Sequence, residues 1–182
     1  MRIVPTALPD VLIVESPVHH DDRGFLSEVF HAEKFAGLGL PTAFTQVNHS
    51  RSARNTLRGL HYQLVQAQGK LVRPMSGAIF DVAVDVRRGS ATSGEWVGLT
   101  LSAGDGRQLW IPPGFAHGFL VTSDVADVAY LCTTTYNPSV ERSIIWSDVR
   151  LGIDWPLPRN EAPLLSPKDA AAPAFQFAEL VE

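Results

Sequence analysis

Short stretches of alternating hydrophobic and polar residues, separated by glycines and prolines, fill most of the chain from Asp21 onward. Alternation with a period of two is typical of β-strands, because successive side chains of a strand point to opposite faces of a sheet. The pattern predicts ten strands, at residues 24–30, 44–50, 57–64, 70–74, 77–86, 95–102, 107–111, 117–122, 127–136 and 142–146. A short helix is predicted at 31–37, and a second from Ser166, which can cap it. So many short strands predict an all-β sandwich or barrel, and a jelly roll is one usual way to arrange them.

Composition limits the classes of protein that fit. With 182 residues, 45% of them hydrophobic, the chain can bury one sizeable core, so we expect a single domain over 1–182. The net charge of −4 and the lack of a basic cluster argue against binding to nucleic acid. A single cysteine, Cys132, excludes an internal disulfide and fits a reducing compartment. No secretion signal and no apolar run of about 20 residues is evident, so a cytoplasmic protein that does not enter a membrane is expected.

Two predicted strands carry polar residues on one face. In 77–86, alternation places Asp81 and Asp85 on the face opposite the valines, and we expect Asp85, near the strand end, to lie on a solvated outer face, with Asp81 deeper. In 127–136, alternation aligns Tyr130 and Cys132 with Tyr136. That strip could supply a phenol proton and a stacking surface, or it could simply pack with its hydroxyl groups reaching solvent.

The segment Leu57–Gln63 places an imidazole, His61, close to a fixed cation, Arg58. A histidine in an apolar strand is more often a core residue than a catalyst. Strict alternation would also place Arg58 and His61 on opposite faces. A bulge at Gly59 could bring them together, because glycine inside a strand often marks a bulge or a close approach of backbones.

The run from Gly106 to His117 contains the spacing G-x5-P-x-G-x2-H, which resembles the second motif of the cupin jelly-roll superfamily. The first cupin motif normally supplies two histidines and a glutamate to a metal. Here His61 is followed by Gln63 in the place of the second ligand, and no suitable glutamate follows. Because a catalytic metal site typically needs three strong protein ligands, we predict a cupin without metal or other cofactor. His19 and His20 lie in a polar segment and are interpreted as surface residues.

Ordered matches to one family extend over nearly the whole chain. They are Asp22–Phe25 with Glu28 and Phe30, Gln46–Ser50, Leu57–Gln63, Lys70–Arg73, Gly77–Val82, Val84–Arg87, Ile111–Phe119, Tyr136–Pro138, Gly152–Pro156 and Leu165–Asp169. Together they resemble the dTDP-4-dehydrorhamnose 3,5-epimerase family of deoxysugar-nucleotide epimerases. The resemblance implies a cupin-type jelly roll that acts on a dTDP-linked 4-keto-6-deoxyhexose on the way to L-rhamnose. Such an enzyme removes a proton next to the C4 ketone and returns one from the opposite face, without a redox cofactor.

The resemblance also implies roles for individual residues. His61, paired with Asp169, corresponds to the base, Tyr130 to the residue that returns the proton, and Lys70 to the cation that stabilises the enolate. The implied substrate-binding residues are Arg23, Glu28, Gln46, Asn48, Arg58, Asp81, His117, Tyr136 and Lys168. Dimers of the family let some of these side chains reach the site of a neighbouring subunit, so a homodimer is expected.

The chain departs from the family pattern in two places. Ala91 and Ser93 replace the proline and the aromatic residue of a common Ser-Pro-Thr-Phe-Gly turn, and Thr134 and Thr135 stand where many relatives have Asp-Tyr. These changes leave open whether C3, C5 or both are inverted. The alternatives are an epimerase of one carbon, an isomerase that moves the ketone, a non-catalytic sugar-nucleotide-binding jelly roll and a metal-dependent cupin oxygenase.

Overall fold

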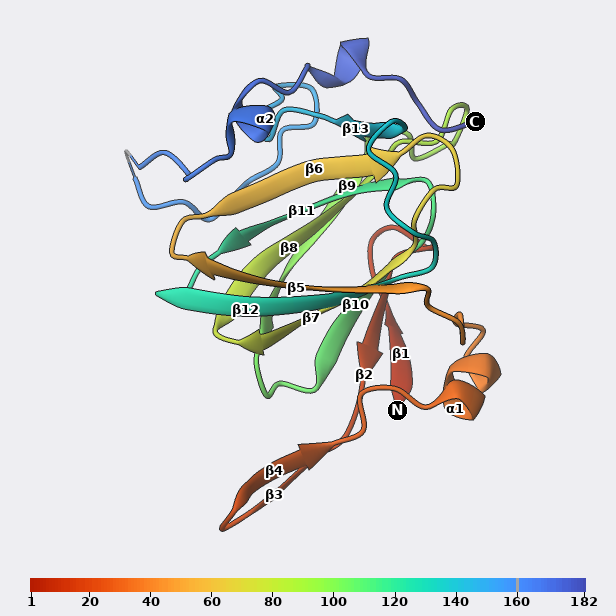
Figure 1. Ribbon diagram of the computed structural model, residues 1–182, viewed down its shortest axis with the longest axis vertical. Coiled ribbons are helices and arrows are strands. Elements are labelled where there is room, and N and C mark those ends of the chain that lie inside the picture. The colour runs from red at the N-terminus through yellow and green to blue at the C-terminus, as the bar shows by residue number, and fades with distance from the viewer. Residues whose placement is uncertain (160) are drawn as a thin grey trace.

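Two antiparallel sheets face each other in the computed structural model, which describes residues 1–159 and 161–182 (Figure 1). One sheet has the order β1 (Arg2–Pro5), β2 (Leu12–Glu15), β10 (Arg107–Ile111), β7 (Lys70–Ser76), β12 (Val125–Cys132) and β5 (Gln46–Ala53). The other has the order β13 (Glu141–Ser143), β6 (Leu57–Gln63), β11 (Phe115–Val121), β8 (Ala78–Asp85) and β9 (Trp96–Ser102). The two sheets form the jelly roll that the sequence predicted.

The remaining elements are short. Strands β3 (Val18–Asp21) and β4 (Gly24–Ser27) form a separate hairpin, α1 spans Ala32–Gly37, α2 spans Pro167–Ala170, and a 3₁₀ turn spans Phe175–Phe177. Both predicted helices are present, and Ser166 caps α2 by accepting a hydrogen bond from the backbone N–H of Asp169 at 3.1 Å. Among the described residues, no helix is long and apolar enough to cross a membrane.

The predicted strands differ from the observed ones at the N-terminus and at β12. Strands β1, β2 and β3 were not predicted; each has only four residues and precedes most of the alternating pattern. The predicted strand 127–136 ends at Cys132 in the structure. The prediction that Tyr136 shares a strand face with Tyr130 and Cys132 is therefore wrong, although Tyr130 and Cys132 do lie on one strand at a spacing of two.

Hydrophobic side chains fill three layers. Between the sheets, Val72 and Val128 of one sheet pack in the same cluster as Ile79 and Phe119 of the other. Behind the five-stranded sheet, a second cluster joins residues of β6, β8 and β11 to the C-terminal segment, including Trp155. A third cluster packs α1 against the outer face of the six-stranded sheet. Both faces of each sheet are therefore covered over part of their area.

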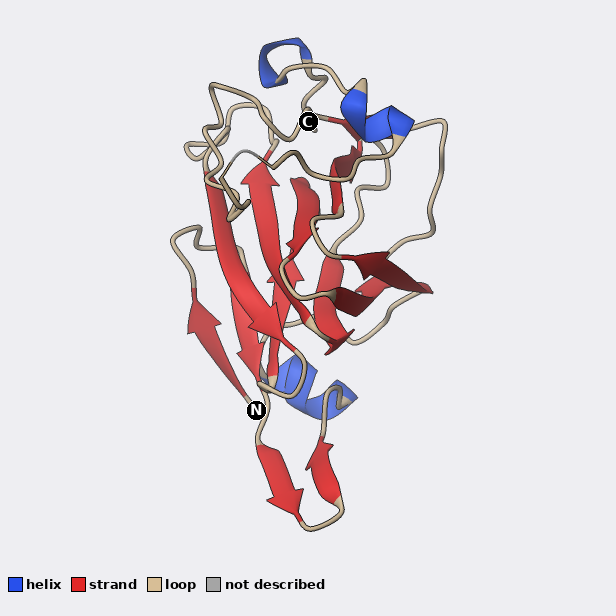
Figure 2. Ribbon diagram, turned by 90° about the vertical axis from the view of Figure 1, so that its left-hand side faces the viewer, coloured by secondary structure: helices blue, strands red, loops and turns tan. Residues whose placement is uncertain are grey.

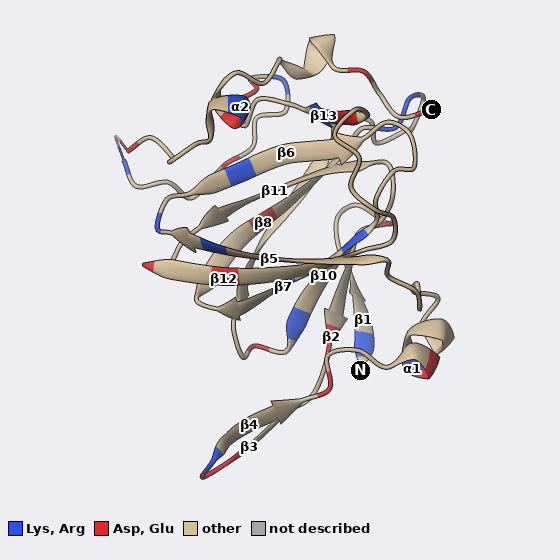
Figure 3. Ribbon diagram, in the orientation of Figure 1, with Lys and Arg blue, Asp and Glu red and all other residues tan. Residues whose placement is uncertain are grey.

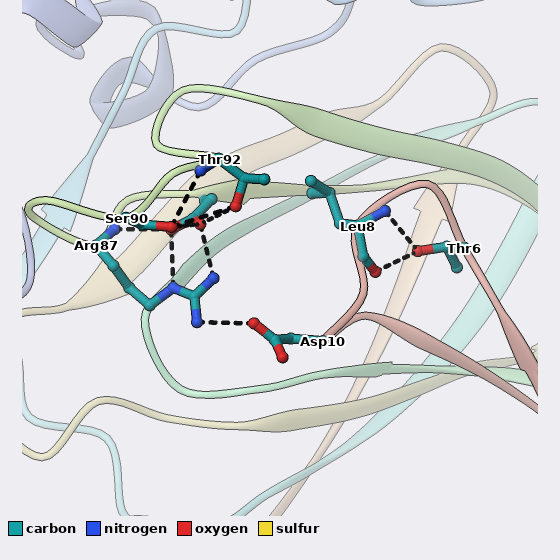
Figure 4. A network of polar contacts seen from close by, with 7 residues as sticks. Thr6, Leu8, Asp10, Arg87, Ser90 and Thr92 are labelled. Carbon is teal, nitrogen blue, oxygen red and sulfur yellow. Dashed lines mark hydrogen bonds and ion pairs between the residues drawn. The ribbon is translucent and has the colours of Figure 1, made fainter.

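The covering of both faces of β8 corrects the prediction for Asp85. Its carboxylate is fully buried, as is that of Asp81, because their side of β8 faces the six-stranded sheet and the C-terminal segment covers the other side. Asp85 accepts hydrogen bonds from the backbone N–H and guanidinium of Arg87 and from the hydroxyl groups of Ser90 and Thr92, at 2.6–3.0 Å. Arg87 also reaches Asp10 at 2.8 Å, which joins the turn after β8 to the N-terminal turn (Figure 4).

The hairpin of β3 and β4 extends away from the two sheets (Figures 1 and 2). Phe25 and Leu26 are 57% and 74% exposed on it, which is unusual for large hydrophobic side chains. Its tip carries charges of both signs, including the pair of Arg23 with Asp21 at 2.5 Å (Figure 3). This exposed apolar surface is available for contact with another molecule.

Substitution of Asp85 by asparagine should lower stability in a pH-dependent way. Burial alone would raise the pKa of Asp85, but the hydrogen bonds from Arg87, Ser90 and Thr92 outweigh it and hold the pKa below its ordinary value. A lowered folded-state pKa contributes stability that is present above about pH 4 and is lost as the pH falls towards the folded-state pKa. We expect Asp85→Asn to lower the free energy of unfolding by roughly 3 kcal/mol at pH 7, and by progressively less below pH 4, in denaturant titrations.

The matched control is Asp105→Asn. Asp105 accepts the same set of bonds from the residue two positions on, Arg107, but lies on the surface. Its substitution should cost less than about 1 kcal/mol. Equal losses for the two variants would contradict a special role for the buried carboxylate.

Candidate active site

A partly open cavity of about 180 Å³ lies between the two sheets, below α2. Its lining residues are Arg58, His61, Lys70, His117, Phe119, Tyr130, Ser166, Lys168 and Asp169. The five-stranded sheet contributes four of them through β6 and β11, the six-stranded sheet contributes Lys70 and Tyr130, and the segment around α2 contributes the rest. All four predicted catalytic residues therefore line one cavity, together with three of the predicted substrate-binding residues.

His61 and Asp169 form a close pair on one wall of the cavity. The Nε2 atom of His61 lies 2.5 Å from the Asp169 carboxylate, which is almost completely buried. Burial raises the pKa of Asp169, but the hydrogen bond and charge of His61 and the bond from Ser166 outweigh it, so that the pKa lies below its ordinary value. An ionised Asp169 accepts a hydrogen bond from Nε2–H, and this arrangement leaves the lone pair of Nδ1 as the basic site of the ring.

Gly59 explains how Arg58 and His61 come to line the same cavity. Its φ of +126° is a conformation that favours glycine, and the pairing of β6 with β11 shifts register between His117 and Phe119, opposite this point. A Cβ atom built on Gly59 would lie 2.5 Å from the Cα of Gly118. The close approach of the two backbones thus requires glycine, and the register irregularity interrupts the strict alternation of side chains.

Tyr130 faces the cavity from the opposite sheet to His61. It lies on β12, and its ring centre is 6.2 Å from that of His117 on β11. Burial raises the pKa of the Tyr130 phenol, so the group stays protonated over the physiological range. An imidazole and a protonated phenol thus enter the cavity from two facing sheets.

Lys70 is the buried cation of the cavity. Its side chain is almost completely buried, and Nζ lies 3.4 Å from the carbonyl oxygen of His61, to which it donates. Burial lowers the pKa of the ammonium group, and the nearby charges of Glu141 and Asp81 only partly offset this. Because a buried cation attracts negative charge strongly, Lys70 is suited to stabilising an oxyanion in the cavity.

His117 and Asp81 form a second, more deeply buried pair. The Nε2 atom of His117 lies 2.7 Å from Oδ1 of Asp81, while Oδ2 of Asp81 has no hydrogen-bond partner in the described part of the chain. Burial lowers the pKa of His117, although the Asp81 charge opposes this shift. Asp81 does not line the cavity itself, and it acts on the cavity through His117.

Glu141, a residue that the sequence did not indicate, joins the cavity residue Lys168 to Tyr136, and we call these three residues the rim of the cavity. Its carboxylate accepts hydrogen bonds from the Nζ atom of Lys168 on α2 and from the hydroxyl group of Tyr136 at 2.8 Å. These two bonds outweigh burial and lower the pKa of Glu141. Tyr136 therefore lies in the loop after β12, with its hydroxyl group on the carboxylate that also binds Lys168, instead of following Tyr130 along a strand.

Besides Asp81 and Tyr136, four predicted substrate-binding residues lie outside the cavity lining. Gln46 and Asn48 are on the edge strand β5, where the Gln46 amide donates to Asn48 at 3.0 Å. Arg23 is on the extended hairpin, and Glu28, just after it, pairs with Lys34 at 2.6 Å. Within one chain, the structure does not bring Arg23 and Glu28 to the cavity.

Sequence reasoning missed Phe119, Ser166 and Glu141 as parts of the site. Phe119 could have been found from its spacing of two from His117, and Ser166 was predicted only as a helix cap. Glu141 carries no local signal, since its partners come from two other segments. Among residues 1–159 and 161–182, no three histidine, cysteine, aspartate or glutamate side chains are grouped as metal ligands would be.

The site can be compared with known proteins. The family model described as dTDP-4-dehydrorhamnose 3,5-epimerase matches residues 5–176. A Pseudomonas aeruginosa protein named dTDP-4-dehydrorhamnose 3,5-epimerase is 54% identical over 180 residues, which cover 98% of each protein.

The chain is also similar to solved structures of epimerases. A crystal structure of dTDP-6-deoxy-D-glucose-3,5-epimerase from Legionella pneumophila Philadelphia 1, in complex with dTDP-4-keto-L-rhamnose, is similar with a TM-score of 0.94 and 49% identity, covering 100% of this chain and 97% of that one. A 3'-monoepimerase from Streptomyces bikiniensis, in complex with dTDP-quinovose, is similar with a TM-score of 0.88 and 36% identity, covering 94% and 87%. Proteins with either number of inverted carbons therefore share this fold.

Replacing Gly59 by alanine should destabilise the protein more than the same change at Gly24. Both glycines have nearly the same φ, +126° and +129°, but a Cβ atom on Gly24 meets nothing within 4 Å, whereas one on Gly59 meets the backbone of β11. The backbone conformation alone costs of order 1–3 kcal/mol in either variant, and overpacking should add about 1–3 kcal/mol at Gly59. Denaturant unfolding measures both losses, and equal values would contradict the close approach.

Proposed function

The chain belongs to the dTDP-4-dehydrorhamnose 3,5-epimerase family, and we propose that it inverts C3 and C5 of dTDP-4-keto-6-deoxyglucose to give dTDP-4-keto-L-rhamnose. The observation that carries this proposal is the placement of His61 and Tyr130 on facing sheets of one cavity. Inversion requires a base on one side of the sugar ring and a proton donor on the other.

The chemistry of the substrate explains why one base can serve both carbons. Hydrogens on C3 and C5 are acidic because loss of either proton gives an enolate that delocalises onto the C4 oxygen. In the chair of a D-gluco sugar these two hydrogens point to the same face of the ring. A single base below the ring can therefore remove both in turn, and a single acid above it can return both.

His61 is the proposed base. With Nε2 bound to Asp169, its Nδ1 atom can take the proton from carbon, and the carboxylate then stabilises the imidazolium that forms. Fixing of the ring by Asp169 also keeps the basic nitrogen in one orientation. Asp169 is thus proposed to orient His61, and not to take the proton itself.

Tyr130 and Lys70 complete the proposed chemistry. The phenol of Tyr130, whose pKa is raised by burial, keeps its proton until the enolate accepts it on the opposite face. The ammonium group of Lys70 stabilises negative charge on the C4 oxygen. Arg58, His117 and Lys168 line the remaining wall and are proposed to hold the sugar and the diphosphate.

We further propose that each subunit is a single domain and that two subunits form a homodimer with shared sites. Arg23 and Glu28 correspond to substrate-binding residues of the family but lie on or beside the hairpin, which extends away from the cavity of its own chain. The exposed Phe25 and Leu26 give this hairpin an apolar surface that a second copy would cover. In such a dimer, the hairpin of one subunit supplies Arg23 to the cavity of its partner.

Solvent exchange tests the proposed reaction. In deuterated water, the protein should introduce deuterium at C3 and C5 of dTDP-4-keto-6-deoxyglucose, as measured by NMR. We expect His61→Asn to slow this exchange by at least about 10²–10⁴-fold while still binding dTDP, because the base is lost but the cavity remains.

The matched control is His49→Asn, which breaks the His49–Asp127 pair on the exposed face of β5 and should leave exchange unchanged. Label at one carbon only would identify an epimerase of a single centre and contradict the double inversion. No label at either carbon with the unsubstituted protein would overturn the proposed reaction.

Mixing two inactive variants tests the shared site. His61→Asn lacks the base, and Arg23→Glu would place a repelling charge beside the diphosphate. If the hairpin serves the partner, a mixed dimer has one intact cavity, so an equal mixture that exchanges subunits should recover about one quarter of the unsubstituted activity. No recovery, in a mixture shown by mass spectrometry to contain mixed dimers, would mean that Arg23 does not act on the partner.

A further inference from the structure

The side-chain amides of three glutamines bind the loop from Thr133 to Asn137, which carries Tyr136. Gln46 accepts from the N–H of Tyr136 at 2.7 Å, Gln68 donates to the carbonyl of Thr134 at 2.7 Å, and Gln63 contacts both neighbours of Tyr136. These glutamines come from β5, from the end of β6 and from the turn before β7. The loop therefore takes its position from the strands around it.

Gln63 makes the most complete of these contacts. Its Oε1 atom accepts from the N–H of Asn137 at 2.7 Å, and its Nε2 atom donates to the carbonyl of Gln66 at 3.1 Å and, more weakly, to that of Thr135 at 3.4 Å. The side chain is only 2% exposed. A buried amide whose donor and acceptor are both used is costly to replace and defines the position of the groups that it binds.

The same strand that carries the proposed base thus holds the loop. Gln63 follows His61 by two residues on β6, and its backbone partner across the sheet is Glu141. Glu141 in turn binds the hydroxyl group of Tyr136 and the ammonium of Lys168, which precedes Asp169 on α2. The backbone of the loop and the side chain of Tyr136 are therefore fixed by two residues that lie opposite each other.

We propose that Gln63 is a positioning residue that holds Tyr136 at the rim of the cavity, so that the tyrosine contributes to binding of the sugar nucleotide. This inference rests on the proposed function and on the substrate-binding role of Tyr136 that the family resemblance implies. Gln63 does not line the cavity, and it acts through the loop. Gln63→Met keeps the length of the side chain but removes both hydrogen-bonding groups. The loop then loses the hydrogen bonds of Gln63 to Thr135 and Asn137, the two neighbours of Tyr136.

Steady-state kinetics with a double-mutant cycle test the proposal. Gln63→Met should raise KM by about tenfold and change kcat by less than about threefold. Tyr136→Ala should have an effect of the same kind. Both changes remove the same contribution of Tyr136 to substrate binding. The KM of the double variant should therefore be no higher than that of the poorer single variant, which is the result expected for coupled residues.

Gln108→Met is the matched control for loss of a buried amide. Gln108 is 3% exposed and donates to the carbonyl of Val29 at 2.7 Å, far along the chain from the loop. Its effect on KM, whatever its size, should multiply with that of Tyr136→Ala, since the two residues share no partner. The proposal would be overturned if the effects of Gln63→Met and Tyr136→Ala on KM also multiplied in the double variant, or if Gln63→Met left KM unchanged.

Folding and the reaction itself are tested separately. If Gln63→Met does not fold, Gln63→Glu replaces it, because this variant keeps the acceptor for Asn137 and loses only the donor. We then expect a smaller rise in KM that is again coupled to Tyr136→Ala. A rise in KM that is not coupled to Tyr136→Ala would overturn the proposal. An inactive unsubstituted protein would instead refute the proposed function, and this result cannot be confused with the behaviour of the Gln63 variants.

Discussion

The close approach of two backbones at Gly59 and Gly118 is the constraint on which the cavity depends. A methyl group on Gly59 would collide with β11, so this contact exists only because both positions are glycine. The register irregularity there lets Arg58 and His61 line one cavity, although strict alternation would separate them. The direction of His61 then determines where Asp169, 108 residues later, can pair with it, and through Asp169 the position of α2.

The interior between the sheets combines an apolar core with a polar cavity, and the polar part is costly. Lys70, Asp81 and His117 are almost completely removed from water, and one oxygen of Asp81 has no partner among the described residues. Burial lowers the pKa values of Lys70 and His117, because a charged group is costly to hold away from water. The apolar packing around Val72 and Phe119 offsets this cost. A pocket with such properties is suited to developing negative charge, since water does not weaken the field of its cation.

Much of the fold could be predicted from local patterns, whereas the rim could not. Alternation located the strands from β4 onward, and the order of Ser166, Pro167 and Asp169 located α2. The burial of Asp85 was not predictable, because alternation shows that two faces differ but not that a distant C-terminal segment covers the apolar one. Tyr136 was misplaced since the alternating pattern of β12 continues past Cys132, while amides from other strands bend the chain away. Glu141 was not predicted because its contact with the cavity runs through Lys168, 27 residues later, and no motif marks that pairing.

The contrast between the strands and the rim also bears on how many carbons are inverted. Residues Arg58, His61 and Gln63 lie on one strand, so the proposed base, a cation and the proposed anchor of the Tyr136 loop would move together if β6 shifted. The two structural relatives act on one or on two centres and yet share the fold, at TM-scores of 0.88 and 0.94. A base and an acid on facing sheets are needed in either case, so this pair alone cannot decide the outcome. Because orientation of a bound intermediate controls its reaction, how the sugar is held is the remaining variable, and the Tyr136 loop and α2 lie next to the cavity where that hold is set.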